Sequence, residues 1–358
     1  AAFYDIENDL DLYQDNIEDL EINFKNLSKK ACPKISFLMI EIDSKIKEYN
    51  DELKEYFKDL SLKRNNFFTD ISNYVSYELG QPTHCYDLEK ISLDISFELT
   101  NEKINFNTLF DKTLTLDGNK NAVFKSNNKI INMAGIMGSK ETACSENTKS
   151  VLIECAFFDP EIIMDKSVKY DIQSEAAHKF ERRVDPLCQE KALRRFIKIV
   201  SNHASIKQLK FFSEDNLNFI PKNIDYSHDR INSILGFNLD KDVHNSILKK
   251  LGFEFENNIV VVPSFRGDII SLNDLSEEIA RVIGYDNINK EKLIIKSNKK
   301  IVHNKEKHIK NSLINKGFYE VINSPFVQDG NLQSVKLDNP LDSNKEYLRS
   351  NLKDSLLN

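Results

Sequence analysis

The sequence contains no tryptophan, only five cysteines, and no apolar run approaching the roughly 18 residues that a membrane-spanning helix needs. The cysteines are odd in number and form no Cys-x-x-Cys pair, so neither a disulfide framework nor a zinc site is indicated. The first residues, Ala1 to Asp5, are acidic where a secretory signal would be basic and then apolar. We therefore expect a soluble protein of the cytoplasm.

An excess of positive charge is also missing. The chain has 49 Lys and Arg against 56 Asp and Glu, a formal net charge of −7. This balance excludes a small module that binds nucleic-acid phosphates with its whole surface, but it allows one local basic face. The most basic stretch is predicted to be helical, and its basic residues are Lys179, Arg182, Arg183, Lys191, Arg194, Arg195 and Lys198.

What is present divides the 358 residues into regions, and the length alone predicts two or three domains. Residues 1–29 form an acidic lead, which we expect to be a linker. Residues 30–212 alternate between strand and helix periodicity. The expected elements are strands at 37–42 and 150–156, helices at 51–62 and 70–80, a hairpin turn at 116–120, a helix capped by Ser174 and a helix opened by Asp185.

A second unit is expected at residues 213–286. Its pattern predicts a short helix ending at Gly236, a helix at 240–251, strands at 253–255 and 259–263, and a third helix at 273–283. Two helices, a strand pair and a third helix indicate a compact winged-helix-like module. Residues 287–358 form a third region that begins with a basic helix.

Two residues in the first region are candidates for chemistry. His84 follows a Gly-x-Pro turn, which places it on a loop rim; it is either a structural hydrogen-bond donor or a functional residue, and it has no partner at metal-ligand spacing. Glu154 interrupts an apolar strand, so its carboxylate must either face solvent or meet a hydrogen-bond donor. The second possibility indicates a carboxylate that selects a polar group on a ligand.

Four acids in the second unit form another constellation. Asp274, Glu277 and Glu278 lie at i, i+3 and i+4 on one helix face, and Asp268 precedes them in a loop. They either complement the helix dipole, at about 0.3–1 kcal/mol each, or form an all-oxygen magnesium site.

Several blocks, in order, carry a family resemblance: residues 73–87, 133–138, 151–160 and 178–186. They resemble the β subunit of bacterial phenylalanyl-tRNA synthetase, over roughly residues 30–358. The resemblance implies an α+β multidomain chain, with a mixed α/β tRNA-editing domain at 30–212, the winged-helix-like module at 213–286, and the start of a catalytically silent class II synthetase-like domain at 287–358. It also implies that the chain is truncated at both ends.

The resemblance gives the candidate residues roles in removing tyrosine that has been wrongly esterified to tRNA(Phe). Glu154 matches the partner of the tyrosine hydroxyl and His84 the editing-site histidine. A site built around such a bond discriminates by roughly 10⁴–10⁵ in favourable cases. Ser174 falls where the family has threonine, Ala176 leaves room for the substrate ring, and Gly135 allows close backbone approach.

Three departures from the family pattern leave an alternative open. Arg183 and Ser139 stand where glycines are usual, and Ala177 replaces a serine. The alternative is a scaffold and RNA-binding segment whose editing pocket has decayed.

The resemblance also implies partners and cofactors. It implies an α subunit that binds ATP and charges tRNA(Phe) within an (αβ)₂ heterotetramer, with no membrane or DNA partner. Asp268, Asp274, Glu277 and Glu278 match the family's Mg²⁺ ligands. The basic helix between Lys179 and Lys198 could meet the phosphates of the tRNA acceptor end.

Overall fold

The computed structural model describes residues 10–43, 45–110, 112–118, 120–172, 174–288, 304–328, 330 and 333–356. The chain divides into two compact units, Ala1–Lys290 and Glu291–Asn358. In the described residues, no helix is both long and apolar enough to cross a membrane.

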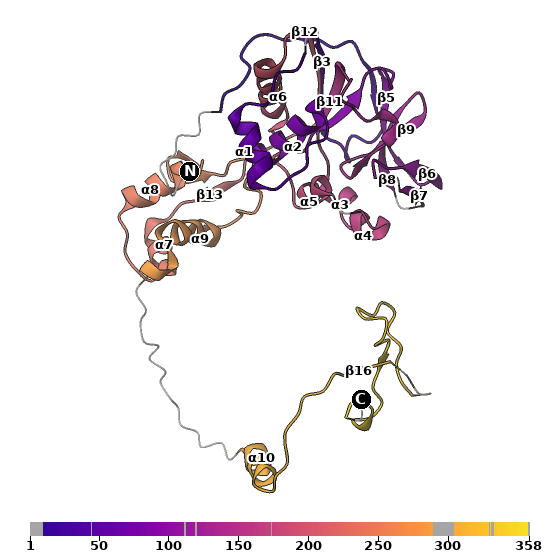
Figure 1. Cartoon of the computed structure of the whole chain (residues 1–358). Helices are drawn as coiled ribbons and strands as arrows, with labels where there is room; N and C mark the ends of the chain where they lie inside the picture. The colour runs from indigo at the N-terminus through magenta and orange to yellow at the C-terminus, as the bar shows by residue number, and fades with distance from the viewer. Residues whose placement is uncertain are drawn as a thin grey trace. The chain divides into compact units, whose positions relative to one another are not determined.

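The first unit is built around two five-stranded sheets (Figure 1). The first sheet has the order β1(Glu18–Asp19), β12(Ile206–Asp215), β3(Lys34–Ile42), β11(Ser150–Phe157), β4(His84–Asp87). The second has the order β10(Met137–Gly138), β9(Lys129–Met133), β8(Asn121–Ser126), β5(Asp94–Thr100), β2(Asn23–Asn26). The predicted strands at 37–42 and 150–156 are thus neighbours at the centre of one sheet.

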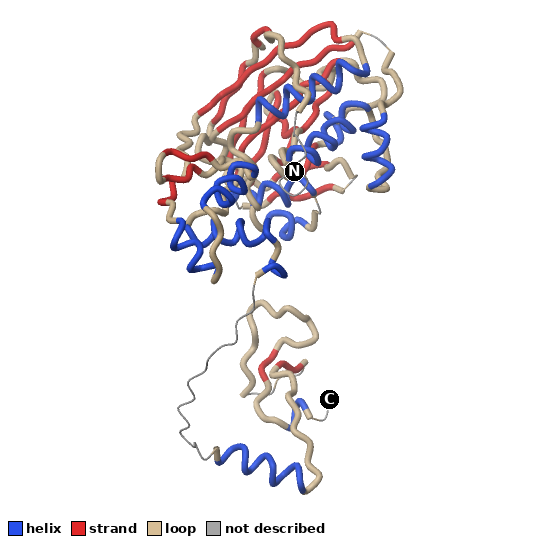
Figure 2. Tube along the Cα trace, turned by 90° about the vertical axis from the view of Figure 1, so that its left-hand side faces the viewer, coloured by secondary structure: helices blue, strands red, loops and turns tan. Residues whose placement is uncertain are grey.

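Strand periodicity gives the first sheet two apolar faces. On β3, Leu38 and Ile40 face a core formed with the helices α1(Asp51–Asp59), α2(Phe67–Leu79) and α6(Gln189–His203). Ile35 and Phe37, of opposite parity, face a second core shared with the other sheet. Figure 2 shows the strands gathered together with helices along them. Residues of β11 follow the same alternation, which places Glu154 on the face between the sheets.

The hairpin expected at Leu116–Lys120 is wrong. The strand β7(Thr113–Leu116) pairs with β6(Ile104–Asn107), whereas β8 pairs with β5 and β9. The tight turn lies instead at Asn127 and Asn128, which join β8 to β9 with φ values of 47° and 63°. Asparagine tolerates this left-handed conformation, which a two-residue hairpin turn requires at both positions.

The acidic lead does not behave as a linker in its described part. Strand β1 pairs in parallel with β12, and β2 pairs in parallel with β5, so the segment provides an edge strand to each sheet. Between the two strands, Leu20 is buried in the core shared by the sheets.

Helix starts in the first unit were predicted to within a few residues. Gly80 ends α2 with φ 71°, as a C-terminal glycine should. Helix α6 begins at Gln189, not at Asp185, whose carboxylate accepts the N–H of Leu187 in a preceding turn. Three short helices follow β11, namely α3(Pro160–Ile163), α4(Lys166–Tyr170) and α5(Glu175–Glu181).

The region expected to form a module at 213–286 contains the three predicted helices and the predicted strand pair, together with a third strand that was not predicted. It contains α7(His228–Leu235), α8(Lys241–Lys250) and α9(Leu272–Ile283), with a sheet of order β13(Asn223–Asp225), β15(Ile259–Val261), β14(Glu254–Glu256). The second unit contains α10(Lys305–Asn315), β16(Phe326–Val327) and β17(Tyr347–Leu348). A basic helix was expected after Asp286. Within the described residues this helix is α10, and residues 289–303 lie outside the described part of the chain.

Candidate functional site

His84 and Glu154 come together across a pair of strands. Strand β4 runs antiparallel to β11, and the register sets His84 directly opposite Glu154. The Gly80–Pro82 turn brings the chain from α2 back to this edge of the sheet. His84 therefore lies at the first position of an edge strand, half-buried, and not on a free loop.

Glu154 lies between the two sheets and is only 4% exposed. Its Oε2 accepts a hydrogen bond from the Tyr86 hydroxyl at 2.7 Å and another from the Asn132 amide at 3.1 Å. The same amide also donates to the Tyr86 oxygen at 2.9 Å. The carboxylate is thus not solvent-facing, and the chain itself provides two donors to one of its oxygens.

Burial determines the protonation of Glu154 and His84. It raises the pKa of Glu154 from 4.5 to about 7, against the opposing effect of the hydrogen bonds from Tyr86 and Asn132. Burial also lowers the pKa of His84 from 6.5 to about 4. The imidazole is therefore neutral at pH 7, and its Nε2 is sealed from solvent with no hydrogen-bond partner among the described residues.

Gly138 is a site residue that the sequence reasoning missed. A Cβ at this position would lie 2.2 Å from His84 Cε1 and 2.7 Å from its Nε2, so only glycine leaves the ring its place. The signal was present in the glycine-punctuated stretch Met133–Gly138, but only its first glycine, Gly135, was singled out. Gly135 has φ 68° and is enclosed by apolar side chains: a Cβ there would lie 3.0–3.1 Å from Ile163, Phe158 and Phe180.

Ser174 caps α5 as expected, because its Oγ accepts the N–H of Ala177 at 3.3 Å. Ala176 is half-buried and packs against the core between the sheets. Ser174 also lines a surface pocket of about 570 Å³, whose lining is Ser167, Val168, Asp171, Ile172, Ser174, Glu175, His178 and Glu181. His84, Gly135, Ala176 and Glu154 do not line it, so this pocket does not unite the predicted site.

The departures Ala177 and Arg183 lie at opposite ends of α5. Ala177 is fully buried in the core between the sheets. Arg183 follows the helix with φ 73°, a conformation that favours glycine. Its side chain is exposed and lies against Gly267, so its bulk is not added around His84.

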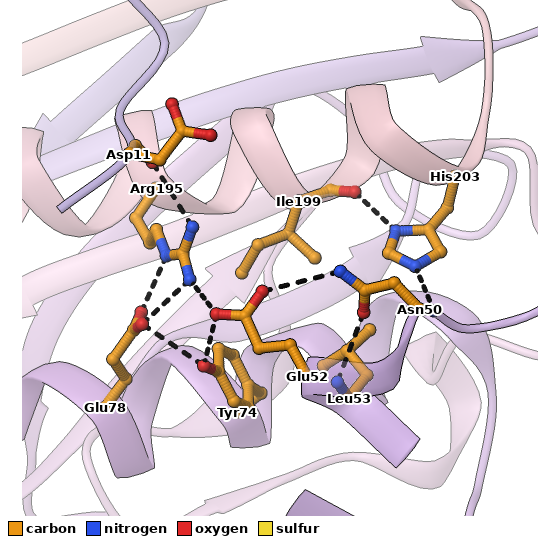
Figure 3. Close-up of polar contacts among 9 residues, drawn as sticks. All are labelled: Asp11, Asn50, Glu52, Leu53, Tyr74, Glu78, Arg195, Ile199 and His203. Atoms are coloured by element: carbon orange, nitrogen blue, oxygen red, sulfur yellow. Dashed lines mark hydrogen bonds and ion pairs between the residues drawn. The ribbon is translucent and has the colours of Figure 1, made fainter. Parts of the chain in front are cut away.

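Most of the basic stretch is engaged within the protein. Arg195 is buried and pairs with Glu78 and Glu52, as Figure 3 shows. Arg194 pairs with Glu190, Lys198 with Asp11, and the Lys179 ammonium donates to the carbonyl of Ser76 at 2.6 Å. The expected phosphate-facing surface is reduced to the exposed residues Arg182, Arg183 and Lys191.

The four acids of the expected magnesium site do not form a ligand cluster in the described residues. Asp268 and Glu278 both pair with Arg266, and Glu278 also pairs with Arg281. Arg266 and then Arg281 lower the pKa of Glu278 to about 2.

The other two acids are separate from these pairs. Asp274 accepts the backbone N–H groups of Ile270 and Ser271 in a capping box at the start of α9. Glu277 is exposed. As they stand, these residues do not present a ready site for the ion, and the magnesium site stays a prediction.

Comparison with known proteins identifies the modules. Three family models match in succession: the B3/4 domain at residues 31–205, the tRNA synthetase B5 domain at 224–285, and the phenylalanyl tRNA synthetase beta chain CLM domain at 292–358. Together they cover most of the chain.

Curated relatives carry the name phenylalanine–tRNA ligase beta subunit. The relative from Methylococcus capsulatus is 30% identical over 345 residues, which cover 92% of this chain and 43% of the relative. The relative from Psychrobacter arcticus is 27% identical and is matched over 98% of this chain and 47% of its own length. Among solved structures, an N-terminal fragment of the phenylalanyl-tRNA synthetase β-subunit from Pyrococcus horikoshii matches with 15% identity and a TM-score of 0.41, over 79% of this chain and 80% of that one.

Successive B3/4, B5 and CLM domains define the class as a β-type subunit of an aminoacyl-tRNA synthetase. The chain belongs to the family of phenylalanyl-tRNA synthetase β subunits. It spans less than half the length of the curated relatives described above.

Proposed function

We propose that residues 30–212 hydrolyse tyrosine that has been wrongly esterified to tRNA(Phe), as the editing part of a phenylalanyl-tRNA synthetase. The observation that supports this most is the meeting of three separate sequence blocks at one place. Strand register sets His84 opposite Glu154, and Gly138 lies directly against the His84 ring.

The residues of the chain suit hydrolysis by a positioned water. A neutral imidazole can accept a hydrogen bond from the attacking water and orient it, and the proposal requires that this water reach the ring when substrate binds. Water adds to the ester carbonyl carbon, the bond to the ribose oxygen breaks, and that oxygen leaves with the proton. Backbone N–H groups at the start of α5, beside Ser174 and Ala176, are the proposed donors for the developing oxyanion.

A cysteine acyl-enzyme is not part of this proposal. Cys85 follows His84 in the sequence, but strand alternation turns it to the opposite face of β4, into the core shared with the helices. Burial raises its thiol pKa well above the ordinary value, which disfavours the nucleophilic thiolate.

For the complete enzyme we propose what the family resemblance implies. The β subunit assembles with an α subunit in an (αβ)₂ heterotetramer of the cytoplasm and contributes to binding tRNA(Phe). ATP, bound by the α subunit, and Mg²⁺ serve the charging reaction.

Deacylation measurements test the editing proposal. The 358-residue chain should release tyrosine from Tyr-tRNA(Phe) faster than the uncatalysed rate, and His84→Ala should lower this rate by about tenfold or more. Cys85→Ala is the matched control on the adjacent position and should leave the rate within about twofold, since its side chain faces away. A wild-type rate equal to the uncatalysed one would refute the proposal.

A second candidate function is the scaffold with a decayed editing pocket. The saturated hydrogen bonding of Glu154 Oε2 favours it, because the acceptor expected for substrate is occupied. In that case the same assay shows no hydrolysis, while the chain still associates with an α subunit.

A further inference from the structure

Tyr86 makes, within the protein, the contact that a tyrosine substrate would make. Its phenol donates to Glu154 Oε2 at 2.7 Å. A substrate tyrosine would offer the same group, a phenolic O–H, to the same carboxylate. The donor chemistry is the same, so a substrate phenol directed at Oε2 would compete with the Tyr86 hydroxyl.

The Tyr86 hydroxyl is also held firmly in place. The residue is fully buried, on the strand next to Glu154, and its oxygen accepts the Asn132 amide at 2.9 Å. Its ring meets the His84 ring edge-on, with centroids 4.5 Å apart. Displacing this hydroxyl would break a network in which each of the three residues supports the others.

Selection by a buried acceptor depends on leaving that acceptor unpaired when the wrong ligand binds. If Glu154 lacked an internal donor, a bound phenylalanyl ester would leave its carboxylate without a hydrogen bond, whereas a tyrosyl ester would provide one. Here Tyr86 and Asn132 satisfy Oε2 whichever amino acid is bound. The penalty that separates phenylalanine from tyrosine is therefore reduced at this oxygen.

We propose that Tyr86 is a specificity-determining residue of the editing site, whose hydroxyl competes with the substrate phenol for Glu154 and so weakens discrimination between tyrosyl and phenylalanyl esters. This inference rests on the proposed editing function. It predicts a site in which removing one oxygen atom from the protein increases selectivity for tyrosine.

The decisive variant is Tyr86→Phe, assayed in the 358-residue chain with Tyr-tRNA(Phe) and Phe-tRNA(Phe). The wild type should prefer the tyrosyl ester by less than about tenfold, and Tyr86→Phe should raise that preference by about tenfold or more, well within what hydroxyl recognition supplies. The gain should appear mainly as a lower KM for the tyrosyl ester, since the change affects binding of the side chain and not the ester chemistry.

Two further variants separate this role from a structural one. In the Tyr86→Phe background, Glu154→Met removes the acceptor and should return the preference to within about twofold of wild type. Tyr74→Phe is the matched control, because the Tyr74 hydroxyl also donates to a carboxylate, that of Glu52 at 2.7 Å, but in the helix layer. It should leave the preference unchanged.

Binding of free L-tyrosine and L-phenylalanine, measured by calorimetry, decides the inference independently of hydrolysis. Tyr86→Phe should bind L-tyrosine about tenfold more tightly than wild type does, with L-phenylalanine affinity changed less than twofold. If no variant hydrolyses either ester, the editing proposal fails, and this shift in affinity still tests the role of Tyr86. A folded Tyr86→Phe protein with unchanged preference and unchanged L-tyrosine affinity overturns the inference, as does a wild type that already prefers tyrosyl ester strongly.

Discussion

Glu154 shows how a single carboxylate is accommodated between two sheets. A buried charge is costly unless it is hydrogen-bonded, and Tyr86 and Asn132 both donate to one of its oxygens. These bonds only partly offset burial, since the pKa remains raised to about 7. The protonation of this residue is therefore linked to the stability of the whole unit.

The pH dependence of stability should report this linkage. Because the folded-state pKa lies above the ordinary value of 4.5, folding favours the protonated form, and the stability associated with Glu154 falls as pH rises from 4.5 through about 7. Relative to Glu154→Gln, which does not titrate, the wild type should lose up to about 3 kcal/mol of unfolding free energy between pH 4.5 and pH 8. Urea unfolding of both proteins at several pH values measures this loss. A difference in unfolding free energy between the two proteins that stays constant with pH contradicts the prediction.

At the scale of elements, Arg195 joins the three helices that cover the first sheet. Its guanidinium, on α6, forms a bidentate ion pair with Glu78 of α2, with both hydrogen bonds at 2.8 Å, and also pairs with Glu52 of α1. The Tyr74 hydroxyl donates to Glu52 at 2.7 Å and lies 3.2 Å from a carboxylate oxygen of Glu78, and the carbonyl of Asp11 accepts from the guanidinium (Figure 3). The residue that the sequence placed on a phosphate-binding face is thus part of the helix packing.

Removing this arginine should destabilise the helix layer. Arg195→Ala leaves two carboxylates facing each other without a cation, and we expect a loss of about 3 kcal/mol in unfolding free energy. The neighbouring Arg194→Ala is the control: its partner Glu190 is exposed, so the loss should stay below about 1 kcal/mol. Equal losses in denaturant unfolding would show that burial of the network does not matter.

At the scale of the whole molecule, the N-terminal segment ties the two sheets of the first unit together. Strands β1 and β2 occupy an edge of one sheet each, and Leu20 between them enters the shared core. A segment that the sequence suggested was a linker thus belongs to the folded unit.

Leu20→Ala tests this integration. Truncating a buried leucine costs about 2–5 kcal/mol, and because Leu20 lies between two edge strands we expect the lower part of that range. Leu27→Ala is the control, since Leu27 is 65% exposed, and should change stability by less than about 0.5 kcal/mol. Thermal unfolding of the two variants compares them, and indistinguishable midpoints would restore the linker interpretation.

Local patterns were enough to predict many of the helices and strands. The periodicity around Leu53 and Ile153, the glycine that ends α2 and the cap at Ser174 are each determined within a few residues along the chain. The hairpin at Leu116–Lys120 failed because its turn residues are compatible with a loop, and strand pairing was decided by distant partners.

The sequence by itself determined the family, the order of its modules, and His84 and Glu154 as candidates, because motifs and apolar periodicity are local properties. Only the tertiary structure decided that Glu154 lies inside, that Tyr86, 68 residues away, already satisfies it, and that Gly138 gives His84 its space. The reason is physical: a hydrogen bond between neighbouring strands depends on register and sheet order, which long-range packing sets and which no short stretch of sequence encodes.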